Sequence, residues 1–218
     1  MKKIFIIVEG QTELEFVKLL LIPYFNNNGI YEVVSQCVCT SKTGKGGLSN
    51  YEYLKNDIQK VLNNRNTNTI VTTFIDFFRI PTNFPNYNLS MKEISSINKV
   101  SKLEDFFGQD INDKRFVPYI QLHEFEALLF SSNRGFEKYE EEKIYFKTKE
   151  IIEAFKNPED INSSPQTAPS KRLLSINPKY KKVIEGNIIA LEIGIETMLE
   201  KCPRFRDWLN TLILKIKE

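Results

Sequence analysis

Acidic residues follow three short apolar segments of the sequence, each at the point where the segment ends. The segments and their acids are residues 4–8 with Glu9, residues 69–75 with Asp76, and residues 117–122 with Glu124 and Glu126. Carboxylates that lie close together repel one another, and they stay ionised together only when a cation neutralises them. Because the ligand atoms are all oxygens, the pattern predicts a site for a hard divalent ion such as Mg²⁺ or Mn²⁺.

The first of these segments shows how such an acid would be positioned. Five apolar, mostly β-branched residues that end at an acid and a glycine are typical of a strand buried on both faces. Thr12 followed by Glu15 fits a capping box, so we expect a helix to begin directly after this strand. Glu9 would then lie at the carboxyl end of a central strand, where open α/β sheets bind their ligands.

The apolar runs alternate with helical patterns, which predicts how the acids come together. A strand over Tyr31–Thr40 and a helix through Leu54 and Ile58 separate the first segment from the second. This β-α-β-α-β series implies a parallel sheet with right-handed crossovers. One acid after a strand is explained by the preference of helix N-termini for Asp and Glu, but three acids at one sheet edge are harder to explain in this way.

Together the patterns predict an α/β fold with a mostly parallel central sheet of about four strands flanked by helices. The predicted core spans residues 1–131, and residues 132–218 form a helical extension that packs on the core and completes the site. A second capping box predicts a helix over residues 90–107. The polar, proline-rich segment 157–170 is a candidate hinge. The apolar stripe of residues 205–216 predicts a final helix that packs on the core by default, with a homodimer seam as the alternative.

Composition excludes several classes of protein. Of the 218 residues, 41% are hydrophobic and 27% are charged, and the net charge is +2. No run of about 18 apolar residues occurs, so we expect no membrane span. Glu9 interrupts the N-terminal apolar run too early for a secretory signal, so the expected compartment is the cytoplasm. The small net charge disfavours a protein that coats nucleic acid by charge alone, and it does not disfavour a nuclease that binds transiently.

The three cysteines and the single histidine exclude other kinds of site. Three cysteines are too few for a disulfide framework, and we expect Cys37, Cys39 and Cys202 to be small buried residues. His123 with Glu124 begins a zinc-hydrolase pattern, but His-Glu-x-x-His needs a second histidine, which the chain lacks. A Ser-His-Asp or Cys-His enzyme would have to use His123 alone, which we regard as the weaker interpretation.

A basic loop and three later lysines are candidates for contact with a polyanion. The loop of residues 41–47 does not fit the phosphate-loop pattern, because Gly46 follows Lys45 where Ser or Thr is required. Its functional interpretation is substrate binding by Lys42 and Lys45, and a solvated loop fits equally well. The predicted positive rim around the acids is completed by Lys179, Lys181 and Lys182.

Aromatic residues in the long loop after Asp76 have two interpretations. Loops of this length within a compact domain are usually functional or disordered. Phe77, Phe78, Phe84 and Tyr87 either stack on bases and sugars of a substrate or pack against the following helix. We favour packing.

The acids belong to longer motifs, which are Val8-Glu9-Gly10-Gln11-Thr12-Glu13, Ile75-Asp76 and the pair Glu124 and Glu126. These motifs resemble the Toprim metal-binding fold, most closely the OLD-type nucleases and the small AriB-like effectors of the PARIS anti-phage system. Further blocks similar to the AriB-like family are Gln-Leu-His-Glu-Phe-Glu-Ala-Leu-Leu-Phe at 121–130, Thr-Ala-Pro-Ser-Lys-Arg at 167–172 and Cys-Pro-Arg-Phe at 202–205. The blocks occur in the same order and span about nine tenths of the chain.

The resemblance implies a Toprim-like Rossmannoid fold and a role for each matching residue. Glu9 matches a metal ligand or general base, and Glu13 matches the second acid of the OLD-type motif. Asp76 matches the first Asp of an Asp-x-Asp pair, and Glu126, with Glu124 close by, matches the third acidic motif. Among the basic residues, Lys171 resembles a lysine that offsets charge on phosphate. Weaker candidates for substrate contacts are Arg172 in the same block and, from the basic loop, Lys42 and Lys45.

One position departs from the resemblance. Phe78 stands where the Asp-x-Asp pair has its second Asp. The lost ligand weakens the case for two tightly held metal ions. We expect Phe78 to pack in the core, although Glu13 or Glu124 would be available to replace the missing carboxylate.

The sequence therefore predicts a metal-dependent nuclease that hydrolyses DNA or RNA with Mg²⁺ or Mn²⁺. By resemblance, it would be an effector of defence against phage or foreign DNA that works beside an ATPase of the ABC or AAA type. One alternative is a catalytically degenerate Toprim-fold module, disabled at Phe78, that docks on such an ATPase. Another is a different enzyme that uses the same acids, such as a primase-like nucleotidyl transferase or a nucleotide phosphatase.

Overall fold

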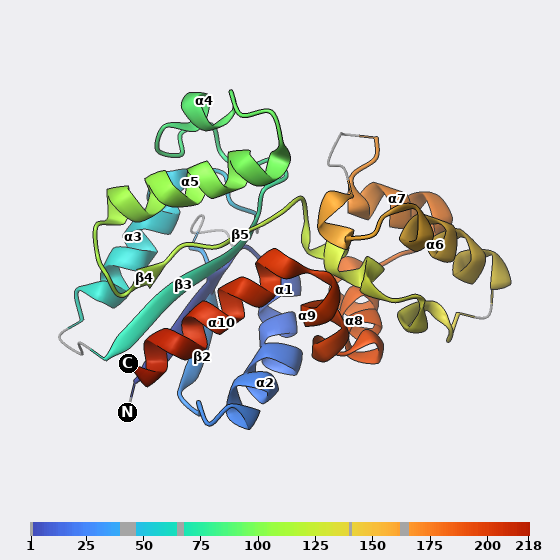
Figure 1. Ribbon diagram of the computed structural model, residues 1–218, viewed down its shortest axis with the longest axis horizontal. Coiled ribbons are helices and arrows are strands. Elements are labelled where there is room, and N and C mark those ends of the chain that lie inside the picture. The colour runs from blue at the N-terminus through green and yellow to red at the C-terminus, as the bar shows by residue number, and fades with distance from the viewer. Residues whose placement is uncertain (1, 40–46, 65–67, 140, 162–165) are drawn as a thin grey trace.

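A computed structural model describes residues 2–39, 47–64, 68–139, 141–161 and 166–218 (Figure 1). The strands are β1 (Lys3–Val8), β2 (Val33–Cys37), β3 (Thr69–Asp76), β4 (Phe116–Val117) and β5 (Ile120–Gln121). The α-helices are α1 (Gln11–Phe16), α2 (Ile22–Asn27), α3 (Tyr51–Leu62), α4 (Tyr87–Ser90), α5 (Ser96–Ile111), α6 (Glu142–Ala154), α7 (Pro169–Ile176), α8 (Asn187–Ile193), α9 (Ile195–Lys201) and α10 (Pro203–Lys217). The π-helices are η1 (Val17–Leu21) and η5 (Lys182–Gly186), and the 3₁₀-helices are η2 (Phe125–Ser131), η3 (Asn133–Phe136) and η4 (Pro158–Asp160).

The strands of the described residues form one parallel sheet in the order β2-β1-β3-β4, with β5 also beside β3. Val8 near the end of β1 lies opposite Phe74 of β3, and Asp76 at the end of β3 lies opposite Gln121 of β5. Every residue of β3 is buried, as expected of a central strand covered on both faces. The predicted α/β fold with a mostly parallel sheet is therefore confirmed, and the carboxyl ends of β1, β3 and β5 share one edge (Figure 1).

The segment predicted as a single strand over residues 117–122 is instead two short strands, both paired with β3. Pro118 lies between them and has no N–H to donate to a strand ladder. The hydroxyl of Thr73 replaces the missing ladder contact. It donates a hydrogen bond to the carbonyl oxygen of Tyr119 (2.9 Å) and accepts one from the N–H of Tyr119 (3.0 Å). This side-chain contact keeps β5 against β3 on the far side of the proline.

Helices cover both faces of the sheet (Figure 1). Ile6 and Val8 of β1 belong to a buried cluster with α1, α2 and α10, whereas Ile7 belongs to a second cluster with α3 and α5. Successive side chains of a strand point to opposite faces, so the apolar run of β1 supplies both clusters at once. The apolar run of β1 is thus continuous because both faces of the strand are buried, as the sequence indicated.

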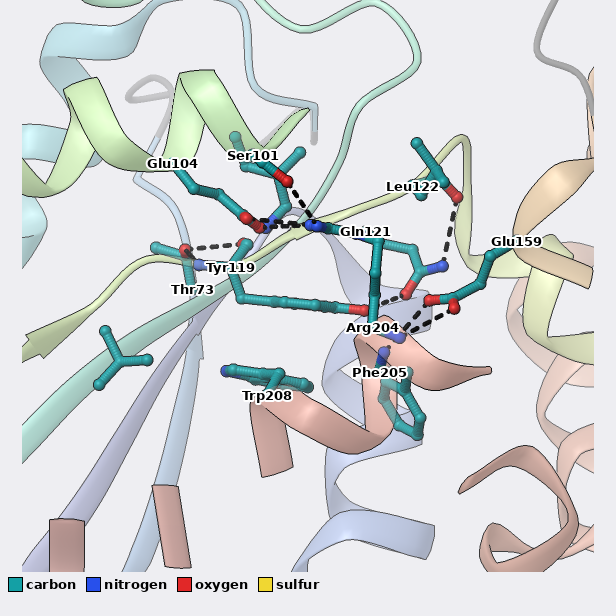
Figure 2. Close-up of polar contacts among 12 residues, drawn as sticks. Thr73, Ser101, Glu104, Tyr119, Gln121, Leu122, Glu159, Arg204, Phe205 and Trp208 are labelled. Atoms are coloured by element: carbon teal, nitrogen blue, oxygen red, sulfur yellow. Dashed lines mark hydrogen bonds and ion pairs between the residues drawn. The ribbon is translucent and has the colours of Figure 1, made fainter. Parts of the chain in front are cut away.

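The last helix, α10, returns from the helical extension to lie along the sheet (Figure 1). Phe205 and Leu209 are fully buried in the same cluster as the residues of β1. Trp208 stacks on Tyr119 with ring centroids 4.2 Å apart (Figure 2), and its indole N–H donates to the Thr72 hydroxyl (2.8 Å). The extension therefore shares its core with the strands, and the amphipathic stripe of the last helix packs within the chain.

The first helix begins two residues earlier than a capping box at Thr12 requires. Gly10 is the N-cap in an extended conformation, and Thr12 already lies within the helix. Glu15 accepts a hydrogen bond from the side chain of Gln11 (2.6 Å) instead of bonding back to the cap. The predicted capping box is wrong, but the strand–glycine–helix order that it indicated is present.

The second predicted capping box is also wrong. The long helix begins at Ser96, because the Ser95 hydroxyl accepts a hydrogen bond from the N–H of Asn98 (3.1 Å) and caps it. Ser90 instead ends the short helix α4. Among the helices of the described ranges, none is both long enough and apolar enough to cross a membrane.

Candidate metal centre

The strand ends bring the predicted acids to one place. Glu9 follows β1, and its Oε2 accepts a hydrogen bond from the backbone N–H of Asp76 at the end of β3 (3.1 Å). Asp76 Oδ1 in turn accepts one from the N–H of Phe125, beside Glu126 (2.9 Å). Glu13 lies in the first turn of α1 and is buried. The parallel sheet thus supplies the convergence that the sequence predicted.

Lys182, the first residue of η5, connects these acids. Its Nζ lies 3.3 Å from Glu13 Oε1, 3.4 Å from Asp76 Oδ2 and 3.3 Å from Glu126 Oε2. Since all three oxygens lie within 3.4 Å of one nitrogen, no two of them are farther apart than twice that distance. They surround a single position, and in this structure an ammonium group fills it.

Glu126 is the least satisfied of the acids. Its side chain is 0% exposed, and neither carboxyl oxygen has a hydrogen-bond partner among the described residues, although Oε2 is within ion-pair distance of Lys182. Burial raises the pKa of Glu126 to about 7, and Lys182 opposes the shift without cancelling it. A buried carboxylate without hydrogen bonds is costly, so this group is a candidate ligand for a cation.

The pKa values of the other charged groups also show that the acids are incompletely neutralised. Burial raises the pKa of Glu9, and the neighbouring Glu13 raises it further. Burial also raises the pKa of Asp76 well above its usual value, although Lys182 opposes the shift. Burial alone would lower the pKa of Lys182, but the surrounding carboxylates outweigh it and raise that pKa well above its usual value. One ammonium group therefore does not neutralise the three acids that it contacts and the neighbouring Glu9.

A cleft of about 250 Å³ opens beside these groups. Its lining includes the side chains of Glu9, Glu13, Asp76 and Lys182. Gly10 and Gly47 also contribute to the wall. Glu9, Glu13 and Asp76 therefore border a space that a substrate group can enter, whereas Glu126 is fully buried behind them.

The family of the chain follows from a comparison with protein-family models. The model for a domain of unknown function, DUF4276, matches residues 8–213. The chain belongs to the DUF4276 family. The matched region contains all the acids of the site and Lys182. No curated protein and no solved structure matches the chain.

The donor atoms of this DUF4276 protein fit a hard divalent ion. They are carboxylate oxygens, they are buried, and those of Glu126 lack hydrogen bonds. Within the described ranges, no set of three or more Asp, Glu, His or Cys side chains is already arranged to hold a metal ion. In this structure the Lys182 ammonium occupies the position that the oxygens of Glu13, Asp76 and Glu126 share.

Glu124 is held apart from the Lys182 contacts. Its two carboxyl oxygens accept hydrogen bonds from the N–H (3.0 Å) and the hydroxyl (2.9 Å) of Ser170 in the first turn of α7. The block at residues 167–172 therefore does meet the block that contains Glu124, but through Ser170. Glu124 has the role of joining α7 to the end of β5 in this conformation.

The basic residues predicted to bind substrate are not among the side chains that contact the acids. Lys171 is exposed, and none of the contacts described for the acids involves its side chain. Arg172 donates to the carbonyl of Thr167 (2.9 Å) and stacks on the Phe155 ring. Predicted substrate contacts outside the described residues are Lys42 and Lys45.

Sequence reasoning named Lys182 only as part of a positive rim, whereas the structure places it among the acids. Lys179 and Lys181 are exposed, as a rim requires. The structure carries a signal in η5, since π-helices are rare and frequently lie at functional sites, but nothing in residues 182–186 predicts a π-helix from the sequence. The partner of Lys182 in β3 is 106 residues away in the chain.

The aromatic side chains of the loop after Asp76 fall into two groups, those that pack on the core and Phe78, which does not. Phe84 is buried in the second cluster, and Phe77 and Tyr87 pack against that cluster, so packing is confirmed for these three. Phe78 is half-buried and joins neither cluster of the described residues. The guanidinium of Arg79 lies 5.2 Å from the centre of its ring. The expectation that Phe78 packs in the core is wrong, because its half-buried ring belongs to neither cluster.

The remaining candidates are structural. Cys202 is fully buried, as predicted, whereas Cys39 is exposed and Cys37 half-buried, because β2 is an edge strand that ends at Cys37. His123 is buried, and its burial lowers the pKa to about 4. It has a left-handed backbone (φ 70°), and its carbonyl accepts the N–H of Phe78 (2.8 Å). No observation gives it a catalytic role.

Proposed function

We propose that this protein is a Mg²⁺- or Mn²⁺-dependent phosphodiesterase that cleaves DNA or RNA. The observation that carries the proposal is the shared position formed by buried oxygens of Glu13, Asp76 and Glu126 at the carboxyl edge of a parallel sheet. Ligand sites of open α/β sheets occur at this edge. The adjacent cleft provides the approach for a phosphodiester.

Each residue has a defined task in this reaction. Asp76 at the end of β3 and Glu126 in η2 would hold the ion, together with Glu9, which follows β1. A divalent ion bound there supplies a Lewis acid for the phosphate and lowers the pKa of bound water. Glu13 points into the same position from α1 and would accept a proton from the attacking water. The hydrogen bond from the Asp76 N–H fixes the carboxylate of Glu9 in place.

The biological setting of the proposal rests on the sequence resemblance. The similarity to OLD-type and AriB-like proteins supports a defence effector that acts beside an ATPase of the ABC or AAA type. The role proposed at first for Lys171 passes to Lys182, since that lysine is the cation that contacts the acids. Lys171 and Arg172 at the start of α7 would then act only in binding substrate.

The test compares two glutamates of the same helix. Purified protein with Mn²⁺ is incubated with single- and double-stranded DNA and RNA, with the neighbouring ATPase added if required. Glu13→Gln should reduce cleavage by about a hundredfold or more. Glu15→Gln is the matched control, because Glu15 pairs with Lys18 at the surface, and it should cut at the wild-type rate. Equal activity in both variants would refute the proposed site.

One observation favours a second function, a metal-free binding module. Lys182 already supplies a cation to the acids, and the described residues contain no ready metal site. In that case Lys182 is a permanent replacement for the ion. Mn²⁺ would then leave the melting temperature unchanged, whereas an ion that binds the folded protein raises it by mass action. A clear rise therefore supports the enzyme and excludes the module.

A further inference from the structure

The side chain of Lys182 reaches the buried acids from the surface of the protein. Its side chain is 35% exposed while its ammonium group is among buried acids, so the stem enters from the surface. The side chain is a flexible four-carbon stem, and it begins at the first residue of η5. Withdrawal of the ammonium toward solvent would need rotation of the side chain only.

The contacts of Lys182 are also long. Charge-assisted hydrogen bonds between an ammonium and a carboxylate are usually about 2.7–2.9 Å. Here the three distances are 3.3 to 3.4 Å, and only the contact with Asp76 qualifies as a hydrogen bond. The ammonium is shared among three oxygens and bonds none of them closely. A small divalent ion would instead draw oxygens to about 2.1 Å and carries twice the charge.

We propose that Lys182 is a displaceable internal cation, which neutralises the acidic site in the metal-free protein and is expelled when a divalent ion binds. This inference rests on the proposed function, because it concerns the same metal position. Expelled from the acids, the ammonium stays at the cleft that it lines, where it can pair with a substrate phosphate. The lysine would also raise the metal concentration that the site requires, which favours the tighter-binding Mn²⁺ over Mg²⁺.

The first test measures metal affinity without any assay of activity. Free Mn²⁺ is followed by electron paramagnetic resonance during titration of wild type, Lys182→Met and Lys181→Met. Removing the competing charge should lower the Mn²⁺ dissociation constant by about tenfold or more, because like charges at this distance repel. Lys181→Met is the matched control, since that lysine is exposed, and its affinity should equal the wild-type value.

The second test uses the wild-type chain, so it stands even if Lys182→Met does not fold. An amine-reactive reagent labels the protein with and without Mn²⁺, and mass spectrometry gives the modification of each lysine. Lys182 should be protected without metal and become labelled at least about fivefold faster with it, since a released ammonium is solvated. Lys181 should be labelled at the same rate in both conditions.

The outcomes separate this inference from the proposed function. Mn²⁺ binding by the wild type with Lys182 still protected, or with equal affinity in Lys182→Met, would overturn the displaceable cation and leave the metal site standing. Absence of Mn²⁺ binding in every protein would overturn both. Tighter binding in Lys182→Met, together with metal-dependent labelling of Lys182, supports both.

Discussion

Two groups of buried acids in this molecule differ in how completely they are paired. The first group is Glu104 and Glu159, which fasten α10 to the rest of the chain (Figure 2). Glu104 forms two contacts of 2.9 Å with the Arg204 guanidinium and accepts the N–H of Ile120 (2.8 Å). Glu159 accepts the N–H groups of Arg204 (2.9 Å) and Phe205 (3.1 Å) in the first turn of α10.

The second group surrounds Lys182 and lacks such pairing. Three acids share one ammonium there, and Glu126 has no hydrogen bond among the described residues. Burial raises the pKa of Glu104 and of Glu159 as well, so burial alone does not distinguish the groups. The difference is that the first group satisfies its own charges, whereas the second leaves oxygens available to a ligand. Incomplete pairing is the better indicator of a functional site.

A cleft of about 210 Å³ lies beside the first group and illustrates the same point. Its lining includes Glu104, Tyr119, Arg204 and Trp208. Glu104 and Arg204 already bond each other, and Tyr119 donates its hydroxyl to Gln121 (2.8 Å). Polar groups that are used within the fold have little capacity for a ligand, so a hollow of similar size does not make this region the active site.

The largest expected effect on stability follows from removing the cation of the first group. Arg204→Met leaves Glu104 and Glu159 buried without their cation, and we expect the free energy of unfolding to fall by about 3–5 kcal/mol. Urea denaturation measures it. Arg206→Met is the control, because that side chain pairs with exposed Asp207 and should change stability by less than about 0.5 kcal/mol. Similar losses in the two variants would contradict the comparison.

Glu126→Gln should raise the free energy of unfolding instead of lowering it. The pKa of Glu126 in the folded protein is about 7 against a usual 4.5, so the folded state holds this proton longer than the unfolded state. The stability from this group is present below pH 4.5 and is lost as pH rises to about 7. At pH 8 in the presence of a chelator, the free energy of unfolding of Glu126→Gln should therefore be about 1–3 kcal/mol higher than that of the wild type.

The matched variant for this prediction comes from the other group. Glu159→Gln weakens two hydrogen bonds to the N-terminus of α10 and should destabilise the protein under the same conditions. Denaturation curves from pH 5 to pH 8 measure both. If Glu126→Gln is destabilised to the same extent as Glu159→Gln, Glu126 is a structural acid and the contrast between the groups fails.

The smallest expected change in stability is at Phe78. Its N–H donates to the carbonyl of His123 just past the end of β3. Because the ring is half-buried outside both clusters, Phe78→Asp should change the free energy of unfolding by about 0.5 kcal/mol or less. The added carboxylate should tighten Mn²⁺ binding in a titration. Phe146→Asp, at an exposed ring in α6, should not.

The acidic edge of the sheet could be predicted from the sequence because its signals are local. An apolar run such as residues 4–8 is continuous only when both faces of a strand are buried, and the alternation with helices makes the sheet parallel. Parallel strands end at one edge, which fixed the approach of Glu9, Asp76 and Glu126 to one another. The exact helix starts at Gln11 and Ser96 were missed, since several polar residues there compete for the cap.

Only the tertiary structure decided how each acid is used. Segment 157–170 reads as a polar hinge, yet Pro158, Glu159 and Ile161 are buried, because the N-terminus of α10 supplies partners to Glu159. Lys182 resembles its exposed neighbour Lys181 in sequence, but packing of η5 against α1 places its ammonium among acids from three other elements. Local sequence determines strands and helices through propensity and periodicity, whereas the neutralisation of a buried charge depends on groups that only long-range packing brings within a few ångströms.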